Sequence, residues 1–136
     1  STINYRFIDV SKGIKFNVTK STDRITSEKV ILSIELLNAI ESAIKAKGYS
    51  MSFDTMVLAG EKSASPHGVP GDRKIQKGDF ILFDLGVIYE GYCSDITRTV
   101  SFGEPTKAQV EIYETVRAAN EAAIAAVKAG VKASET

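Results

Sequence analysis

Residues 78–102, GDFILFDLGVIYEGYCSDITRTVSF, contain the clearest strand pattern of the chain. The continuous apolar run at 80–83 follows Gly78-Asp79 and is typical of a strand that is buried on both faces. Further strands are predicted over 87–89 and 93–102, separated by turns at Gly86 and at Glu90-Gly91. The middle of the chain is therefore expected to form a series of strands joined by short turns.

An amphipathic helix is predicted on each side of these strands. Over 26–47, apolar residues recur every three or four positions, Thr26 or Ser27 can cap the start, and Gly48 suits a left-handed end. Over 106–128, Thr106 and Gln109 have the spacing of a capping box, and Gly130 ends the helix. The two apolar stripes are Val30, Ile31, Ile34, Leu37, Ile40 and Ile44, and Val110, Tyr113, Val116, Asn120, Ala123, Ile124 and Val127. The order helix, strands, helix predicts an α+β fold with helices on a mostly antiparallel sheet.

The remaining segments show a less regular pattern of apolar and polar residues. Residues 53–58 are predicted to form a strand that ends before Gly60, and residues 61–74 are predicted to form a loop. Residues 1–25 are turn-rich and stay unassigned, with one candidate strand at 14–18.

The composition is that of a globular domain. The chain has 136 residues, of which 43% are hydrophobic and 25% charged, so one folded domain is expected rather than disorder. Because 17 basic residues balance 17 acidic ones, the formal net charge is zero, and neither nucleic acid nor a membrane is expected as a partner. The single cysteine, Cys93, fits a reducing compartment, and the N-terminus lacks the pattern of a signal peptide. We therefore expect a cytoplasmic location.

Two carboxylates stand out in the strand region. Asp84 ends a buried apolar run, where an unpartnered charge is costly, and Asp95 follows 11 residues later in the next predicted strand. A hairpin of this length can bring both to one patch, where a hard divalent cation would relieve their repulsion. The plainer alternatives are that Asp84 caps a turn and that Asp95 forms an ion pair with Arg98.

His67 is the only histidine and lies in the loop sequence SPHGVP at 65–70. A lone histidine in a loop is most often a surface residue. However, Pro66 and Pro70 stiffen the backbone on both sides, and a positioned histidine near carboxylates could transfer a proton.

Five spaced motifs together resemble the pita-bread metallopeptidases, in particular the branch of Xaa-Pro dipeptidases (prolidases) and Xaa-Pro aminopeptidases. The motifs are SFDT at 52–55, PHGVPGDR at 66–73, GDFILFDLG at 78–86, GYCSDITRT at 91–99 and GEP at 103–105. Because they agree in order over roughly residues 52–136, the resemblance is specific. It implies that residues 26–136 form the first half of a pita-bread catalytic domain.

The resemblance also implies a site with two divalent metal ions, usually manganese, cobalt or zinc. The position of Asp84 would chelate one ion, that of Asp95 would bridge both, and His67 would contact the substrate or the reaction intermediate. Thr97 would support the ligands. In this family the remaining ligands, one histidine and two glutamates, come from a second half of the domain. Residues 1–136 contain no second histidine, so we expect this chain alone to bind metal weakly or not at all and to be inactive.

Three functions are therefore considered. The chain belongs to an exopeptidase that cleaves Xaa-Pro bonds, with a proline-containing peptide as substrate, the second half of the domain as partner and a homo-oligomer as the expected assembly. Alternatively, it is a non-catalytic pita-bread module that binds a peptide or protein, although such a module has no need of Asp84 and Asp95. In the third case it is a separate α+β domain in which both carboxylates are structural.

Overall fold

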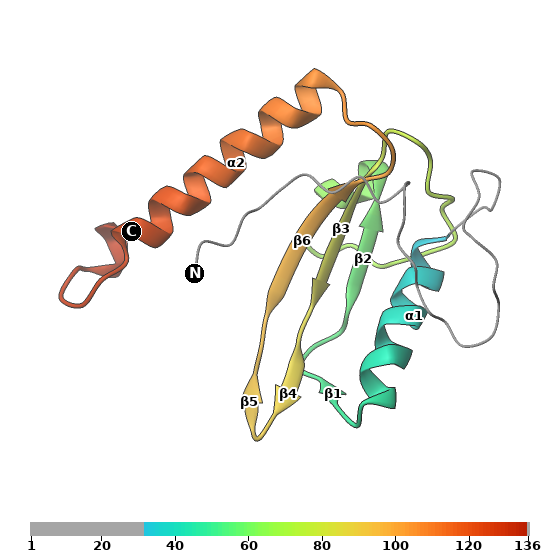
Figure 1. Ribbon diagram of the computed structural model, residues 1–136, viewed down its shortest axis with the longest axis horizontal. Helices are drawn as coiled ribbons and strands as arrows, with labels where there is room; N and C mark the ends of the chain where they lie inside the picture. Colours follow the sequence, from blue (N-terminus) through green and yellow to red (C-terminus); the bar gives the residue numbers. More distant parts are fainter. Residues whose placement is uncertain (1–31, 136) are drawn as a thin grey trace. The chain divides into compact units, whose positions relative to one another are not determined.

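The computed structural model describes residues 32–135, which fall into two units that are treated separately below (Figure 1). One unit contains the described residues up to Glu104, and the other begins at Pro105. The candidate strand at 14–18, the caps at Thr26 and Ser27 and the unassigned segment 1–25 lie outside the described residues. Between residues 32 and 135, no helix is long and apolar enough to span a membrane.

The first unit contains two three-stranded sheets, and every strand pair in them is antiparallel, as predicted. In the larger sheet β3 lies between β2 and β6, and in the smaller one β4 lies between β1 and β5. The larger sheet comprises β2 (Met56–Ala59), β3 (Phe80–Leu85) and β6 (Ile96–Ser101). The smaller sheet comprises β1 (Ser50–Met51), β4 (Val87–Tyr89) and β5 (Tyr92–Cys93).

Several predicted segments between the helices differ from the structure. In place of the predicted strand 53–58, β2 spans Met56–Ala59 and pairs with β3, and a separate strand, β1, pairs with β4. The predicted loop 61–74 begins with a 3₁₀ helix, η2 (Gly60–Ala64). The first difference depends on strand pairing between segments that are distant in sequence, whereas η2 is closed by local bonds such as that from the Ser65 amide to the Lys62 carbonyl.

Helix α1 (Ser33–Ala46) packs beside β2 (Figure 1). It begins at Ser33 rather than at Thr26, because Leu32 has extended dihedrals and forms a bridge with Lys74. Its deepest core residue is Leu36, which the predicted stripe omitted, whereas Leu37 and Ile40 of that stripe are partly buried. The helix ends as predicted before Gly48, which has a φ of 83°.

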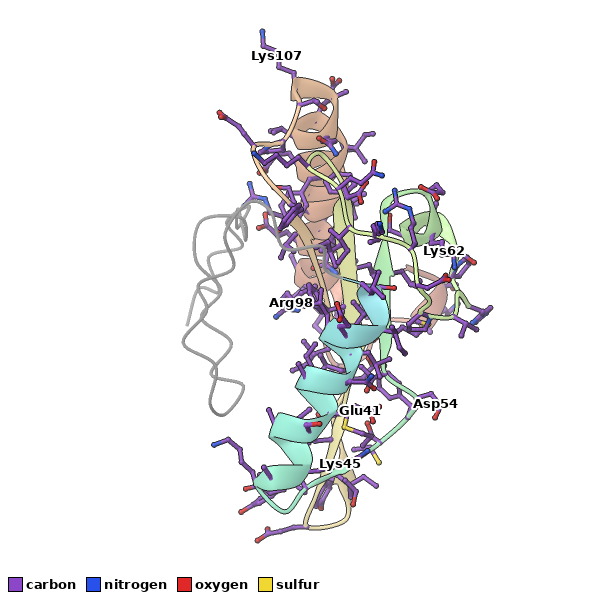
Figure 2. All side chains as sticks on the ribbon, turned by 90° about the vertical axis from the view of Figure 1, so that its right-hand side faces the viewer. Glu41, Lys45, Asp54, Lys62, Arg98 and Lys107 are labelled. Atoms are coloured by element: carbon purple, nitrogen blue, oxygen red, sulfur yellow. The ribbon has the colours of Figure 1, made fainter. Side chains whose placement is uncertain are left out.

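The outer side of α1 is charged. Lys45 donates a 2.9 Å hydrogen bond to Glu41, one helical turn away, and this bond lowers the pKa of the Glu41 carboxyl (Figure 2). Helix α1 therefore has the expected amphipathic form, with an apolar side on the sheet.

Alternation along the strands separates two faces of the larger sheet. Val57, Ala59, Ile81 and Val100 belong to the core cluster that includes Leu36 of α1. The opposite face carries Met56, Leu82, Asp84 and Thr97, and we call it the carboxylate face. Within β3 only Ile81 is fully buried, so the prediction of a strand buried on both faces is wrong. The other residues of β3 are half-buried on both faces of the sheet.

The second unit contains helix α2 (Lys107–Ala126) and a short 3₁₀ helix, η3 (Ala133–Glu135). The predicted capping box is confirmed: Thr106 Oγ1 accepts from the Gln109 amide, and Gln109 Oε1 accepts from the Thr106 amide. Helix α2 ends at Ala126, two residues before the predicted end, because Val127 has extended dihedrals.

Candidate metal centre

A single long hairpin carries both candidate carboxylates. One arm contains β3 and β4, the other contains β5 and β6, and Tyr89 pairs with Tyr92 across the tip. Glu90 and Gly91 both have positive φ, 49° and 84°, which is the form of a two-residue type I′ turn. The predicted turn at Glu90-Gly91 is therefore confirmed. Gly86, predicted as another turn, instead lies within one arm of the hairpin.

The two arms of this hairpin have equal length between its two sheets, although strand pairing is interrupted there. Leu85 pairs with Ile96 and Ile88 pairs with Cys93, so each arm advances three residues between these two pairs. No residue is inserted on either arm, and Gly86 lies opposite Asp95. Because Asp84 pairs with Thr97, the register fixes the positions of Asp84 and Asp95 along the two arms of the hairpin.

Asp84 lies on the central strand and is half-buried. It pairs directly with Thr97 of β6, whose hydroxyl donates a 3.0 Å hydrogen bond to Asp84 Oδ1. This bond fixes one carboxylate oxygen and leaves the other oxygen available to a cation. Asp84 does not cap a turn, because it continues regular pairing on both sides.

Asp95 is exposed and stands directly before β6. It lies two residues from Thr97, so strand alternation places it on the carboxylate face, diagonal to Asp84. Diagonal neighbours of this kind have Cα atoms about 7–8 Å apart, which suits two carboxylates that share cations. Arg98 Nη1 donates a 2.7 Å hydrogen bond to the Thr97 carbonyl, and an ion pair of Arg98 with Asp95 remains the alternative considered from sequence.

A polar junction beside Asp95 holds the two sheets together. The Val87 amide donates 3.0 Å to Ser94 Oγ, and the Ser94 carbonyl accepts 2.8 Å from Ser52 Oγ. The Ser52 amide in turn donates 3.0 Å to the Gly86 carbonyl. A Cβ at Gly86 would lie 1.9 Å from the Ser94 carbonyl oxygen, so only glycine fits there. Sequence reasoning missed the roles of Ser52 and Ser94, although both lie in the motifs quoted above.

The turn that carries His67 crosses the same face of the sheet. The Gly68 amide donates to the Ser65 carbonyl, and a Cβ at Gly68 would lie only 2.9 Å from Leu58 Cδ1. Leu58 alternates with Val57 and is fully buried on the same face as Leu82, and it lies two residues along β2 from Met56, the partner of Asp84. Successive positions on one strand face are about 7 Å apart, so the turn passes close to the carboxylates. The His67 side chain itself is exposed.

The donor set fits part of a divalent metal site. Two carboxylates on adjacent arms of one hairpin are the oxygen ligands that hard divalent cations prefer. Within the described part of the chain, no group of three or more His, Cys, Asp or Glu side chains could hold a metal ion. Asp84 and Asp95 can therefore supply only some of the ligands that a tightly bound ion requires.

A carboxylate pair on an antiparallel sheet of an α+β fold is a feature of metal-dependent hydrolases. The sequence pattern of metallopeptidase family M24 matches residues 18–136, and the chain belongs to this family. Its fold is part of the pita-bread fold, so the resemblance found in the sequence is confirmed.

Known relatives are longer than this chain. An uncharacterized peptidase of Staphylococcus saprophyticus is 53% identical over 121 residues, which cover 88% of this chain and 33% of that protein. The chain therefore spans about a third of the length of this curated relative.

Solved structures show the same fold. The prolidase from Pyrococcus furiosus matches with a TM-score of 0.74 and 41% identity, over 79% of this chain and 32% of that one. An X-Pro aminopeptidase from Thermotoga maritima matches with a TM-score of 0.72 and 40% identity, over 75% and 29%.

Proposed function

We propose that residues 26–136 form the first half of a pita-bread catalytic domain that hydrolyses Xaa-Pro peptide bonds with the help of divalent metal ions. The observation that supports the proposal is the register of the hairpin, in which Asp84 pairs with Thr97 and Asp95 stands two residues before Thr97. The substrate class is supported by the names of the structural neighbours, a prolidase and an X-Pro aminopeptidase.

Each site residue has a separate role in this proposal. Asp84 and Asp95 hold the metal ions, and Thr97 keeps the Asp84 carboxylate oriented through its hydrogen bond. The exposed imidazole of His67 can donate a hydrogen bond to a peptide backbone or accept one from it. When bound, two divalent ions of this kind activate a water molecule and polarise the scissile carbonyl; manganese, cobalt and zinc are the candidates.

The proposal is tested with the protein at the full length that its gene encodes. After chelation, cleavage of an Xaa-Pro dipeptide should fall at least about 100-fold and return when Mn²⁺ is added, because metal stabilises several kcal/mol of developing charge. A dipeptide without proline serves as the control substrate, and a tripeptide that begins with Xaa-Pro separates dipeptidase from aminopeptidase activity. Binding of prolyl peptides without cleavage would favour the non-catalytic module instead, and cleavage that is insensitive to chelation would exclude a metallopeptidase.

The 136-residue chain alone should be inactive and bind divalent ions weakly. Because two carboxylates provide few ligands, we expect a dissociation constant for Mn²⁺ on the order of 10⁻⁴ M or weaker in calorimetric titration. The double variant Asp84→Asn/Asp95→Asn should show no binding at all. Two ions bound with nanomolar affinity by residues 1–136 would contradict the incomplete ligand set.

We also propose that the chain associates with a second copy of itself. Large apolar side chains are exposed in the described residues, among them Tyr92 at 82% and Val69 at 75%. The cytoplasmic location remains a prediction from sequence.

A further inference from the structure

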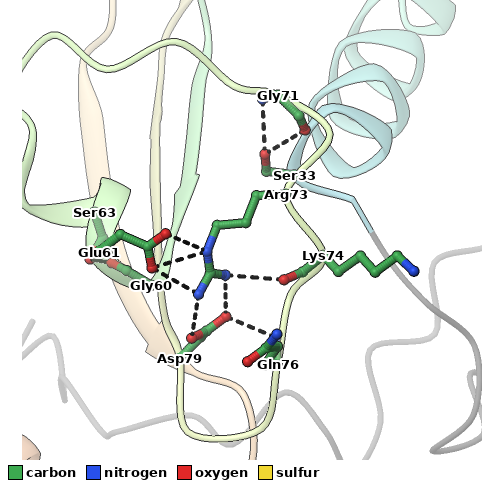
Figure 3. Close-up of polar contacts among 9 residues, drawn as sticks. All are labelled: Ser33, Gly60, Glu61, Ser63, Gly71, Arg73, Lys74, Gln76 and Asp79. Carbon is green, nitrogen blue, oxygen red and sulfur yellow. Dashed lines mark hydrogen bonds and ion pairs between the residues drawn. The ribbon is translucent and has the colours of Figure 1, made fainter.

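The loop that carries His67 is closed by one arginine. Arg73 Nε donates a 2.9 Å hydrogen bond to Glu61 Oε1, and Arg73 Nη1 donates a 2.6 Å bond to Asp79 Oδ2 (Figure 3). Glu61 belongs to η2, before the His67 turn, and Asp79 stands at the start of β3, after it. The guanidinium therefore joins the two ends of the loop.

The three side chains of this network are buried to different degrees. Arg73 and Asp79 form a buried inner pair, and Glu61 is the exposed outer partner. Arg73 and Asp79 are 20% and 12% exposed, whereas Glu61 is 74% exposed. Asp79 also accepts a 2.8 Å bond from the Gln76 amide, so the inner pair holds the entry into β3. The outer hydrogen bond, from Arg73 to Glu61, closes the loop that carries His67.

Glycine makes room for the guanidinium. Gly60 has a φ of 60°, and a Cβ there would lie 2.2 Å from Arg73 Nη2. The planar guanidinium thus packs directly against the backbone at the end of β2. This placement suits the fork-like geometry of arginine, which a lysine ammonium does not reproduce.

A second contact anchors the same loop to α1. Ser33, which is 2% exposed, donates a 3.0 Å bond to the Gly71 carbonyl and accepts a 3.2 Å bond from the Gly71 amide. The segment after the turn is therefore held at Gly71 and again at Arg73. The remaining freedom of the loop lies between Glu61 and Gly71, where His67 is located.

We propose that Arg73 is a positioning residue for His67, acting by closing the loop between Glu61 and Arg73. His67 lies midway, six residues from each partner. Closing a loop lowers the number of conformations open to its middle, so the ion pair restrains the backbone that carries His67. This role in catalysis rests on the proposed function, because it requires that His67 contacts the substrate.

The charges of the network support closure at neutral pH. The hydrogen bond from Arg73 lowers the pKa of the Glu61 carboxyl. The hydrogen bonds that the Arg73 guanidinium donates to Asp79 and Glu61 raise its pKa. Glu61 and Arg73 are therefore both charged at neutral pH.

The test uses the 136-residue chain, in which the ring signals of His67 are unambiguous in NMR because it is the only histidine. Glu61→Gln removes the charge that strengthens the outer bond and leaves the buried Arg73–Asp79 pair in place, so the fold should persist. Arg73→Lys keeps the positive charge but removes the planar guanidinium that donates to both Glu61 and Asp79. Arg117→Gln is the matched control, since Arg117 also holds two carboxylates, Glu114 and Glu121, but within helix α2.

We expect hydrogen exchange of the Gly68 amide, which closes the His67 turn, to become about tenfold faster in Glu61→Gln and in Arg73→Lys. Amides of α1 and β3 should keep their wild-type rates, and Arg117→Gln should change neither. In the protein at its full encoded length, both loop variants should lower kcat about tenfold with KM nearly unchanged.

Unchanged Gly68 exchange and unchanged His67 ring signals in both variants would overturn the proposal, whatever the activity. Faster exchange with wild-type kcat would overturn the positioning role as well. The exchange measurement does not depend on peptidase activity. A failure of the proposed function would instead be seen in the protein at its full encoded length as no cleavage of an Xaa-Pro dipeptide, or as cleavage insensitive to chelation, so the two failures are distinguishable.

Discussion

Asp84→Asn and Asp95→Asn should each lower kcat/KM for an Xaa-Pro dipeptide at least about 10³-fold in the protein at its full encoded length. Asparagine keeps the size of the side chain but removes the charge that holds a divalent cation. A factor of 10³ corresponds to about 4 kcal/mol of lost transition-state stabilisation, in keeping with loss of a metal-bound group. Steady-state kinetics with Mn²⁺ in excess measures the effect.

Two further variants make this experiment specific. Thr97→Val removes only the hydrogen bond to Asp84 Oδ1, so it should cost less, about 10- to 100-fold. Asp54→Asn is the matched control, because Asp54 is exposed between β1 and β2 (Figure 2) and should leave activity unchanged. If Asp84→Asn kept its activity and raised the free energy of unfolding, Asp84 would be a structural residue and the third reading of the sequence would hold.

Gly86→Ala is expected to have the largest effect on stability. The added Cβ would lie 1.9 Å from the Ser94 carbonyl oxygen and 2.2 Å from Ser52 Oγ, so the two arms of the hairpin must separate. Because one of these atoms belongs to the backbone, a simple rotamer change cannot relieve the clash. We expect the free energy of unfolding to fall by about 3 kcal/mol or more in urea denaturation.

The matched control for this substitution is Gly71→Ala. A Cβ at Gly71 would meet only Lys62 Nζ, at 3.2 Å, and that ammonium ends a flexible side chain. The stability should therefore change little. A free energy of unfolding for Gly86→Ala within about 1 kcal/mol of wild type would show that the junction of Ser52, Gly86 and Ser94 tolerates expansion.

The sequence allowed the candidate residues of the site to be predicted, but not how they are arranged. The apolar run at 80–83 and the turn at Glu90-Gly91 indicated a hairpin, and the spacing of 11 residues indicated that Asp84 and Asp95 could meet. The sequence did not predict that Asp95 lies opposite Gly86, because register depends on pairing across the whole hairpin. It also did not connect Arg73 with Glu61, whose contact depends on how a 12-residue loop closes.

The sequence by itself determined the antiparallel strands, the capping box of α2, the left-handed end of α1 at Gly48 and membership of a metallopeptidase family. These features depend on local dihedral preferences, on short-range hydrogen bonds and on spaced motifs, all of which are contained in neighbouring residues. The start of α1 at Ser33, the burial of its apolar residue Leu36 and the position of Asp84 on the sheet face opposite the core cluster were decided by tertiary contacts. Those outcomes depend on contacts such as Leu32 with Lys74, between residues far apart in sequence, which form only when the sheet and the helix have packed together.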